Sequence, residues 1–218
     1  MFYIISNIKT LQTEEEMNTN TLIEKLKKTT AYKERTAILT ELIQPMQQPD
    51  RTYDIEASHI DEKLQIWGGR YGGLEIYPDY QRGNDWEQAD QIHYIENLLR
   101  GNVDRKGKTI LVNIVGFGTD AVKTNIEHAV TILDGLQRYT AIEAFKKAEF
   151  TIFNGLSLQD LEHSKYHLQE IELHLAVYNF ADKVQLLKFY KMINQTGKAH
   201  KQSEFDRIDG MITDLQTN

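Results

Sequence analysis

The sequence predicts an α+β fold, in which a mixed sheet with packed helices is preceded by a helical addition at the N-terminus. Short runs of β-branched and aliphatic residues are interspersed with amphipathic segments, but without the strict strand-helix-strand rhythm of a doubly wound parallel sheet. The 218 residues are enough to bury a core of ordinary size. We divide the chain into an N-terminal helical extension, residues 1–50, and a main domain, residues 51–218.

The extension contains two amphipathic segments, "TLIEKLKK" and "ERTAILTELI", between residues 20 and 44. The stretch "QPMQQPD", which follows at residues 44–50, holds two of the three prolines and marks the boundary. The opening "MFYIISNIKTL" is too short for a membrane span and lacks the features of a signal peptide, so we expect a strand or docking segment. The extension is expected to pack on the main domain, and a partner-binding arm is the alternative.

The main domain shows further strand and helix patterns. Strands or extended segments are predicted at residues 52–56, 76–80, 109–115, 129–133, 150–153 and 172–180. Helices are predicted over residues 58–67, over 136–147, from about 181 to Gly197, and after Ser203. Another helix is predicted to begin at a cap formed by Asn84 or Asp85, and its apolar face would consist of Ile92, Ile95 and Leu99. The stretch "GGRYGG", residues 68–73, is predicted to be a glycine-broken turn.

Composition narrows the range of functions. The chain has no cysteine, which excludes disulfides and thiolate zinc sites and makes the cytoplasm the expected location. Its formal net charge of −7 argues against broad sequence-independent DNA binding, although a local basic groove remains compatible. The glycine-rich "GNVDRKGKT" precedes a strand rather than the helix of a phosphate loop. His163 and His167, one helical turn apart in "HSKYH", are interpreted as surface histidines.

The stretch "ILDGLQRYTAIEAF", residues 132–145, places polar groups where a buried strand meets a helix. Gly135 would let a ligand approach the backbone, and the first turn of a helix favours an anion. Arg138 could bind a phosphate through two hydrogen bonds, and Asp134 could hold a magnesium ion or orient a water. The alternative is that Asp134 caps the helix and Arg138 pairs with a surface carboxylate. A second Gln-Arg pair, Gln81 and Arg82, also lies between an extended segment and a helix.

Three segments in one order carry a resemblance to a known family: "YPDYQRGNDWEQADQIHYIENLLRG", "ILDGLQRYTAIEAF" and "FYKMINQTGKAHKQSEF". This series resembles the ParB/sulfiredoxin-like superfamily and, within it, the family of the GmrS half of GmrSD, restriction enzymes directed at modified DNA. The similarity covers roughly residues 53–208. The family's central motif is Asp-Gly-Gln-Gln-Arg, preceded by a Tyr-Gln-Arg or Phe-Gln-Arg element and followed by an Asn-x-x-Gly segment.

The resemblance implies roles for individual residues. Asp134, Gln137 and Arg138 would be catalytic, and Asp134 would hold Mg²⁺ or another divalent cation. The residues that would bind nucleotide and phosphate are Gln81, Arg82, Gly135, Arg138, Asn194 and Gly197, while Glu204 also matches the late element. The sequence departs from the family at Leu136, where glutamine is usual, and at Tyr139, where leucine is usual.

The implied function is a domain that binds and hydrolyses a nucleoside triphosphate and that acts on or senses DNA in restriction or phage-host conflict. Its chemistry would be that of a metal-dependent phosphohydrolase or DNA phosphodiesterase. In the restriction systems a second domain of the HNH type is the nuclease, and no His-Asn-His grouping follows Phe153 here. We therefore expect nucleotide, DNA and a separate HNH nuclease subunit as partners, and no membrane. The alternatives are a non-hydrolysing nucleotide- or DNA-binding module that docks a nuclease, and a DNA base-modification or anti-restriction protein.

Overall fold

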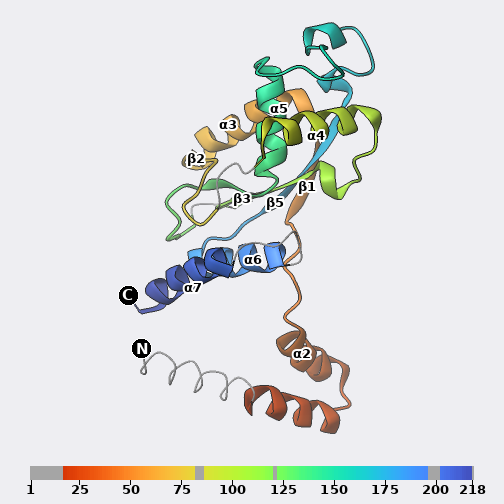
Figure 1. Ribbon diagram of the computed structural model, residues 1–218. Helices are drawn as coiled ribbons and strands as arrows, with labels where there is room; N and C mark the ends of the chain where they lie inside the picture. The colour runs from red at the N-terminus through yellow and green to blue at the C-terminus, as the bar shows by residue number, and fades with distance from the viewer. Residues whose placement is uncertain (1–16, 82–85, 120–121, 196–201, 218) are drawn as a thin grey trace. The chain divides into compact units, whose positions relative to one another are not determined.

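The computed structural model describes residues 17–81, 86–119, 122–195 and 202–217 (Figure 1). By its contacts the chain divides into two units, Met1–Gln47 and Gln48–Asn218, which are described separately. Several predictions fall outside the described residues: the opening strand or docking segment, and the sites at Arg82 and Gly197.

The described part of the first unit contains two helices, in the two segments where the sequence predicts them. Residues 17–28 are helical, and α2 spans Tyr32–Ile43. The guanidinium of Arg35 donates hydrogen bonds from Nη1 to the carbonyl oxygens of Leu26, at 2.9 Å, and Thr29, at 2.8 Å. It therefore fastens the end of the first helix to the second.

The described part of the second unit is built on a five-stranded mixed sheet of order β1-β5-β3-β4-β2. Its strands are β1 (Arg51–Glu56), β2 (Leu74–Glu75), β3 (Thr109–Ile114), β4 (Val130–Asp134) and β5 (Glu172–Tyr178). Strand β1 is antiparallel to β5, β5 is parallel to β3, β3 is antiparallel to β4, and β4 is parallel to β2. The predicted α+β class with a mixed sheet is therefore confirmed.

Helices cover both faces of the sheet (Figure 1). One face packs against α3 (Ile60–Tyr71), α4 (Gln88–Arg100) and α5 (Leu136–Lys146), and the other against α6 (Lys183–Gln195) and α7 (Gln202–Thr217). Single-turn helices are η1 (Ala57–His59), η2 (Lys106–Lys108), η3 (Gln159–Leu161) and η4 (Leu168–Glu170). Leu173 and Leu175 of β5 enter the first core, whereas Ala176 and Tyr178 enter the second. This alternation follows from the two-residue period of a strand.

The glycine-broken turn predicted over residues 68–73 is confined to Gly72 and Gly73, because α3 continues through Gly68 to Tyr71, with Gly72, whose φ is 106°, as its C-cap. A Cβ at Gly68 would lie 2.7 Å from Cβ of Leu74. The missing side chain therefore lets β2 pack closely against α3. This tertiary contact outweighs the weak helix propensity of glycine.

Two of the predicted strands are not formed. In place of a strand over residues 76–80, β2 comprises only Leu74–Glu75, and the backbone N–H of Gln81 donates to the carbonyl of Pro78 at 2.9 Å in a turn. In place of a strand over 150–153 there is one isolated bridge between Ile152 and Leu156. The positive φ angles of Phe153 and Asn154, 45° and 62°, turn the chain back on itself there.

Two helix starts also differ from prediction. The N-cap of α4 is Glu87, which forms a reciprocal capping box with Asp90 instead of a cap at Asn84 or Asp85. Ser203 lies inside α7, which already includes Gln202, so Ser203 is not its cap.

Candidate functional site

The corner between β4 and α5 combines an irregular strand end with a left-handed glycine. Strand β4 ends at Asp134, and Gly135, with φ of 96°, is the N-cap of α5. Val112 pairs with Ile132 but Leu111 pairs with Asp134, so Leu133 is an extra residue in a β-bulge. Bulges and left-handed glycines re-aim side chains at sheet ends. The sequence motif therefore lies at a sharp, specifically shaped turn.

Arg138 packs over Gly135 and pairs with Asp134. A Cβ at Gly135 would lie 2.9 Å from Cγ1 of Ile110 and 3.0 Å from Nη2 of Arg138. Nη2 of Arg138 donates to Oδ2 of Asp134 at 2.8 Å, and the two side chains are 17% and 41% exposed, respectively. Asp134 makes no capping hydrogen bond at the start of α5. The two polar residues of the motif are thus bonded to each other. The capping part of the alternative is not found, whereas Arg138 does pair with a partly exposed carboxylate, that of Asp134 itself.

A pocket of about 120 Å³ opens at this corner. Three separate segments line it: the chain before α4, the β4–α5 corner and α6. It brings together six residues singled out from the sequence, namely Gln81, Asp134, Gly135, Gln137, Arg138 and Asn194, with Trp86, Leu133, Leu136 and Tyr190. Arg82 and Gly197, the other two predicted binding residues, lie outside the described part of the chain.

Two of the residues that line this pocket each have a buried side-chain atom without a hydrogen-bond partner. Among the described residues, three buried side-chain atoms have no partner, and two of them are Nε of Arg138 and Oε1 of Gln81. Burying an unsatisfied polar atom costs about 1–3 kcal/mol, so such atoms call for an explanation such as a bound ligand or water. Nε is a donor and Oε1 is an acceptor, so a ligand that satisfies both must offer an acceptor and a donor.

Gln137 has a positioning role in this structure. Its Oε1 accepts a hydrogen bond at 3.2 Å from the backbone N–H of Trp86, which lies just before α4. The ring of Trp86 also packs against Tyr94, with centroids 5.4 Å apart. Gln137 therefore holds one wall of the pocket in place.

Two tyrosines near the corner stay protonated at neutral pH. Burial raises the pKa of Tyr94 to about 12, although nearby Arg138 acts in the opposite direction. Burial, followed by a 2.6 Å hydrogen bond that the Tyr139 hydroxyl donates to Asp61, raises the pKa of Tyr139 well above its usual range. Tyr139 thus ties α5 to α3, and neither tyrosine is suited to act as a general base.

In the described part of the chain, the candidate metal ligand Asp134 does not belong to a group of three or more acidic or histidine side chains that could share an ion. Among the described residues, the group of three or more such side chains close enough to share an ion consists of Asp54, Glu172 and His174. His163 and His167 lie in irregular turns rather than on a helix, so their spacing does not place them on one face.

Comparison of the chain with protein-family models, with curated proteins and with solved structures gave no match. The proposals about function therefore rest on the three sequence segments that carry the family resemblance and on the geometry of the β4–α5 corner. Within the described residues, no helix is both long and apolar enough to cross a bilayer.

Sequence reasoning missed two pocket-lining aromatic residues and the group of side chains that could hold a metal ion. Trp86 and Tyr190 sit in segments quoted for the resemblance, but nothing in their spacing marks them as pocket walls. Glu172 and His174 are two residues apart in a predicted strand, and this spacing places both on one face. Asp54 lies beside these two side chains because of the register between β1 and β5, which the local sequence does not specify.

Proposed function

We propose that this chain binds the phosphate groups of a nucleoside triphosphate at the β4–α5 corner. The observation that carries the proposal is Nε of Arg138, a buried donor without a hydrogen-bond partner that belongs to a residue lining this pocket. A phosphate oxygen is a suitable acceptor for the guanidinium. The N-terminal amides of α5, which have no partner within the helix, add to the attraction for an anion.

The size of the pocket limits what it can hold. A volume of about 120 Å³ is well below the roughly 300–1,000 Å³ of typical small-molecule sites. The pocket suits a phosphoryl group, and the sugar and base would lie outside it. The proposal therefore assigns phosphate recognition to the corner and leaves the choice of base to other contacts.

Charge balance favours a nucleotide that brings a divalent cation. Asp134 already neutralises Arg138, so a phosphate would meet the Asp134 carboxylate as a like charge. Mg²⁺ is commonly held by one or two carboxylates together with substrate phosphates. Asp134, whose side chain is 41% exposed, fits the role of that single carboxylate. The cation would supply positive charge at the corner.

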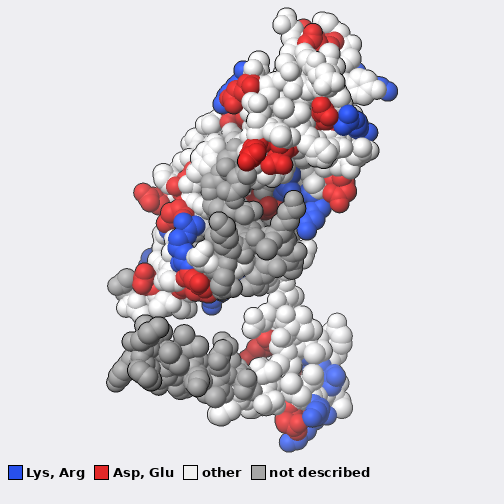
Figure 2. All heavy atoms as spheres, viewed as in Figure 1, with Lys and Arg blue, Asp and Glu red and all other residues white. Residues whose placement is uncertain are grey.

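Contact with DNA is proposed to be local. Figure 2 shows acidic and basic side chains of the described residues interspersed over the second unit on the face in view. Together with the net charge of −7, this distribution favours a small contact area over a broad electrostatic surface. The sensing of modified DNA rests on the resemblance to the GmrS family alone.

The binding proposal is tested by calorimetric titration of the full chain with ATP, GTP, CTP and UTP in magnesium. We compare the wild type with Arg138→Ala, Arg138→Lys and, as a matched loss of charge, Arg105→Ala on the exposed η2 segment. Losing a charge-assisted hydrogen bond should weaken binding by about ten- to a hundredfold in Arg138→Ala. Arg138→Lys should also bind more weakly because it loses the planar guanidinium. Equal affinity in wild type and Arg138→Ala, with both folded, contradicts the proposal.

Hydrolysis is the second candidate function, and the exposed carboxylate of Asp134 in the same pocket is what favours it. Phosphate release from each nucleotide is measured with and without plain or modified DNA, in wild type and Asp134→Asn. Release that depends on Asp134 supports a phosphohydrolase. Tight binding without release selects the non-hydrolysing module instead.

A further inference from the structure

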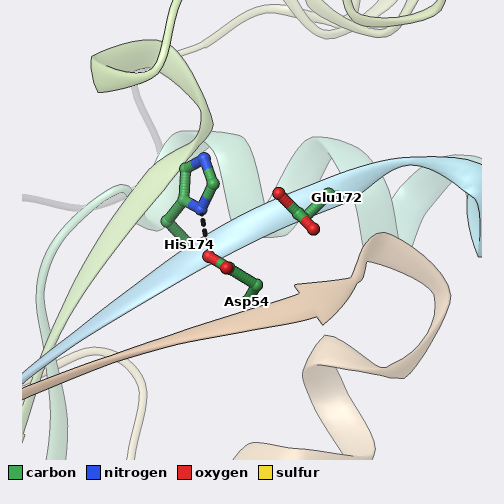
Figure 3. A group of neighbouring side chains, drawn as sticks. All are labelled: Asp54, Glu172 and His174. Carbon is green, nitrogen blue, oxygen red and sulfur yellow. Dashed lines mark hydrogen bonds and ion pairs between the residues drawn. The ribbon is translucent and has the colours of Figure 1, made fainter.

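A second group of chemically active side chains lies on the strands β1 and β5. Asp54 of β1 and His174 of β5 face each other in the antiparallel register, and Nδ1 of His174 lies 2.6 Å from Oδ1 of Asp54. Glu172 precedes His174 by two residues and so shares its face of β5. Figure 3 shows the three side chains gathered on one side of these strands. One potential ligand atom from each lies within 4.8 Å of the other two.

The charges of this group are unbalanced. The side chain of His174 is only 8% exposed, and that of Asp54 is 56% exposed. Among the described residues, no lysine or arginine forms an ion pair with Asp54 or Glu172 within 4.0 Å. Two carboxylates therefore flank one buried imidazole without a permanent cation. If His174 only formed a stabilising hydrogen bond, Asp54 would be a sufficient partner and Glu172 would have no role. A bound cation would use the carboxylates of both Asp54 and Glu172.

We propose that Asp54, Glu172 and His174 bind a divalent transition-metal cation, with Zn²⁺ as the preferred representative. One imidazole nitrogen and two carboxylate oxygens suit a borderline cation, whereas Mg²⁺ and Ca²⁺ favour oxygen ligands alone. Ligands bound at about 2.0–2.2 Å lie at most about 4.4 Å apart, so a small rotation of the exposed Glu172 brings the group into range. The cation takes the place of the hydrogen bond between His174 and Asp54, and the imidazole proton then resides on Nε2.

The proposed cation site is separate from the phosphate pocket and does not depend on the proposed function. His174 pairs with Thr109 of β3, while Asp134 pairs with Leu111 on the other side of that strand. Two strand spacings, about 10 Å, therefore separate the two sites. Paired catalytic metals lie only about 3.5–4 Å apart, so the cation would not share a phosphate with Asp134. Its direct effect is to link the edge strand β1 to β5.

The test is equilibrium dialysis of the full chain, without a histidine tag, against Zn²⁺ and separately against Mg²⁺. We expect one tight Zn²⁺ per chain and weaker Mg²⁺ binding. Asp54→Asn and Glu172→Gln preserve side-chain shape at exposed positions and should weaken Zn²⁺ binding at least about tenfold, since loss of an outer-shell partner alone costs that much. Zn²⁺ should also raise the thermal midpoint of the wild type more than that of either variant.

Two controls separate this site from binding at other histidines. Glu170→Gln removes an equal charge from the exposed η4 segment, and His163→Gln combined with His167→Gln removes two turn histidines. Both should keep the tight Zn²⁺. The proposal is overturned if the wild type binds no Zn²⁺ tightly, or if Asp54→Asn and Glu172→Gln bind it as tightly as the wild type.

Discussion

Nη2 of Arg138 donates a hydrogen bond to Oδ2 of Asp134 at 2.8 Å, which joins the cation and the carboxylate of the corner motif to each other. The pair is separated by one helical turn and by the left-handed Gly135. An anion that enters the pocket must therefore compete with Asp134 for Arg138. A divalent cation on Asp134 would remove that competition, so binding of anion and cation at this corner should be coupled.

Replacing Asp134 by asparagine should have opposite effects with and without metal. In the absence of divalent cations, Asp134→Asn should bind inorganic pyrophosphate more tightly than the wild type, because a competing negative charge is removed. Magnesium should strengthen binding to the wild type but not to the variant. Isothermal titration with and without magnesium measures both effects, with Glu162→Gln at an exposed position as the control for net charge. Weaker metal-free binding in Asp134→Asn would show that the carboxylate does not oppose the anion.

Adding a methyl group at Gly135 should damage both stability and the pocket. Gly135→Ala forces a left-handed φ on a residue with a Cβ and brings that Cβ to 2.9 Å from Ile110 and 3.0 Å from Arg138. We expect a loss of about 1–3 kcal/mol in the free energy of unfolding from backbone strain, with a further loss from the contacts. Denaturant titration measures the change.

Gly101→Ala is the matched control for that substitution. Gly101 also has a positive φ, 75°, but a Cβ there would have no atom within 4 Å. Its replacement should therefore cost only the backbone strain. Equal losses at the two glycines would mean that Arg138 and Ile110 move aside at little cost.

Loss of the Gln137 side chain should release Trp86. Gln137→Ala removes the acceptor of the Trp86 backbone N–H and should lower the free energy of unfolding by about 1 kcal/mol. The tryptophan emission should shift to the red as Trp86 becomes more exposed, and the same substitution in a Trp86→Phe background should cause no shift. Gln137→Glu keeps an acceptor and should leave the emission near that of the wild type. An unchanged spectrum in Gln137→Ala would place the support of Trp86 elsewhere, for example in its contact with Tyr94.

Local sequence predicted the corner well because its parts are adjacent in the chain. An apolar run that ends in Asp-Gly before a helical pattern defines a strand, a left-handed turn and a helix start within a few residues. The structure has β4 ending at Asp134 and α5 beginning at Leu136. The convergence of Gln81 and Asn194 on this corner could be expected only from the resemblance, since it depends on how α4 and α6 pack.

The errors have a common physical origin in contacts between distant residues. Gly68 continues α3 because Leu74 packs against it, although local propensity favours a break. His174 meets Asp54 because of the β1–β5 register, and local sequence does not encode a contact between residues 120 positions apart. Leu136, which replaces the usual family glutamine, is 3% exposed and belongs to the core beneath the pocket, so an amide there would be buried.

Buried tyrosines should make the fold sensitive to alkaline pH. An unfolded tyrosine ionises near pH 10, whereas burial holds the pKa of Tyr94 at about 12. Between these values the unfolded chain releases a proton that the folded chain retains, so the free energy of unfolding falls as pH rises. The slope for one such group approaches about 1.4 kcal/mol per pH unit, and below pH 10 the effect is absent.

The Tyr94→Phe variant isolates this contribution. At pH 8 it should be less stable than the wild type by about 1 kcal/mol, because the hydroxyl no longer donates to the carbonyl of Gly107. From pH 10 to 12 its stability should fall less steeply, so that the two curves cross within this range. Denaturant titrations at each pH measure this, with the exposed Tyr166→Phe as control. Parallel curves for wild type and Tyr94→Phe would mean that Tyr94 ionises in the folded protein as readily as in the unfolded chain.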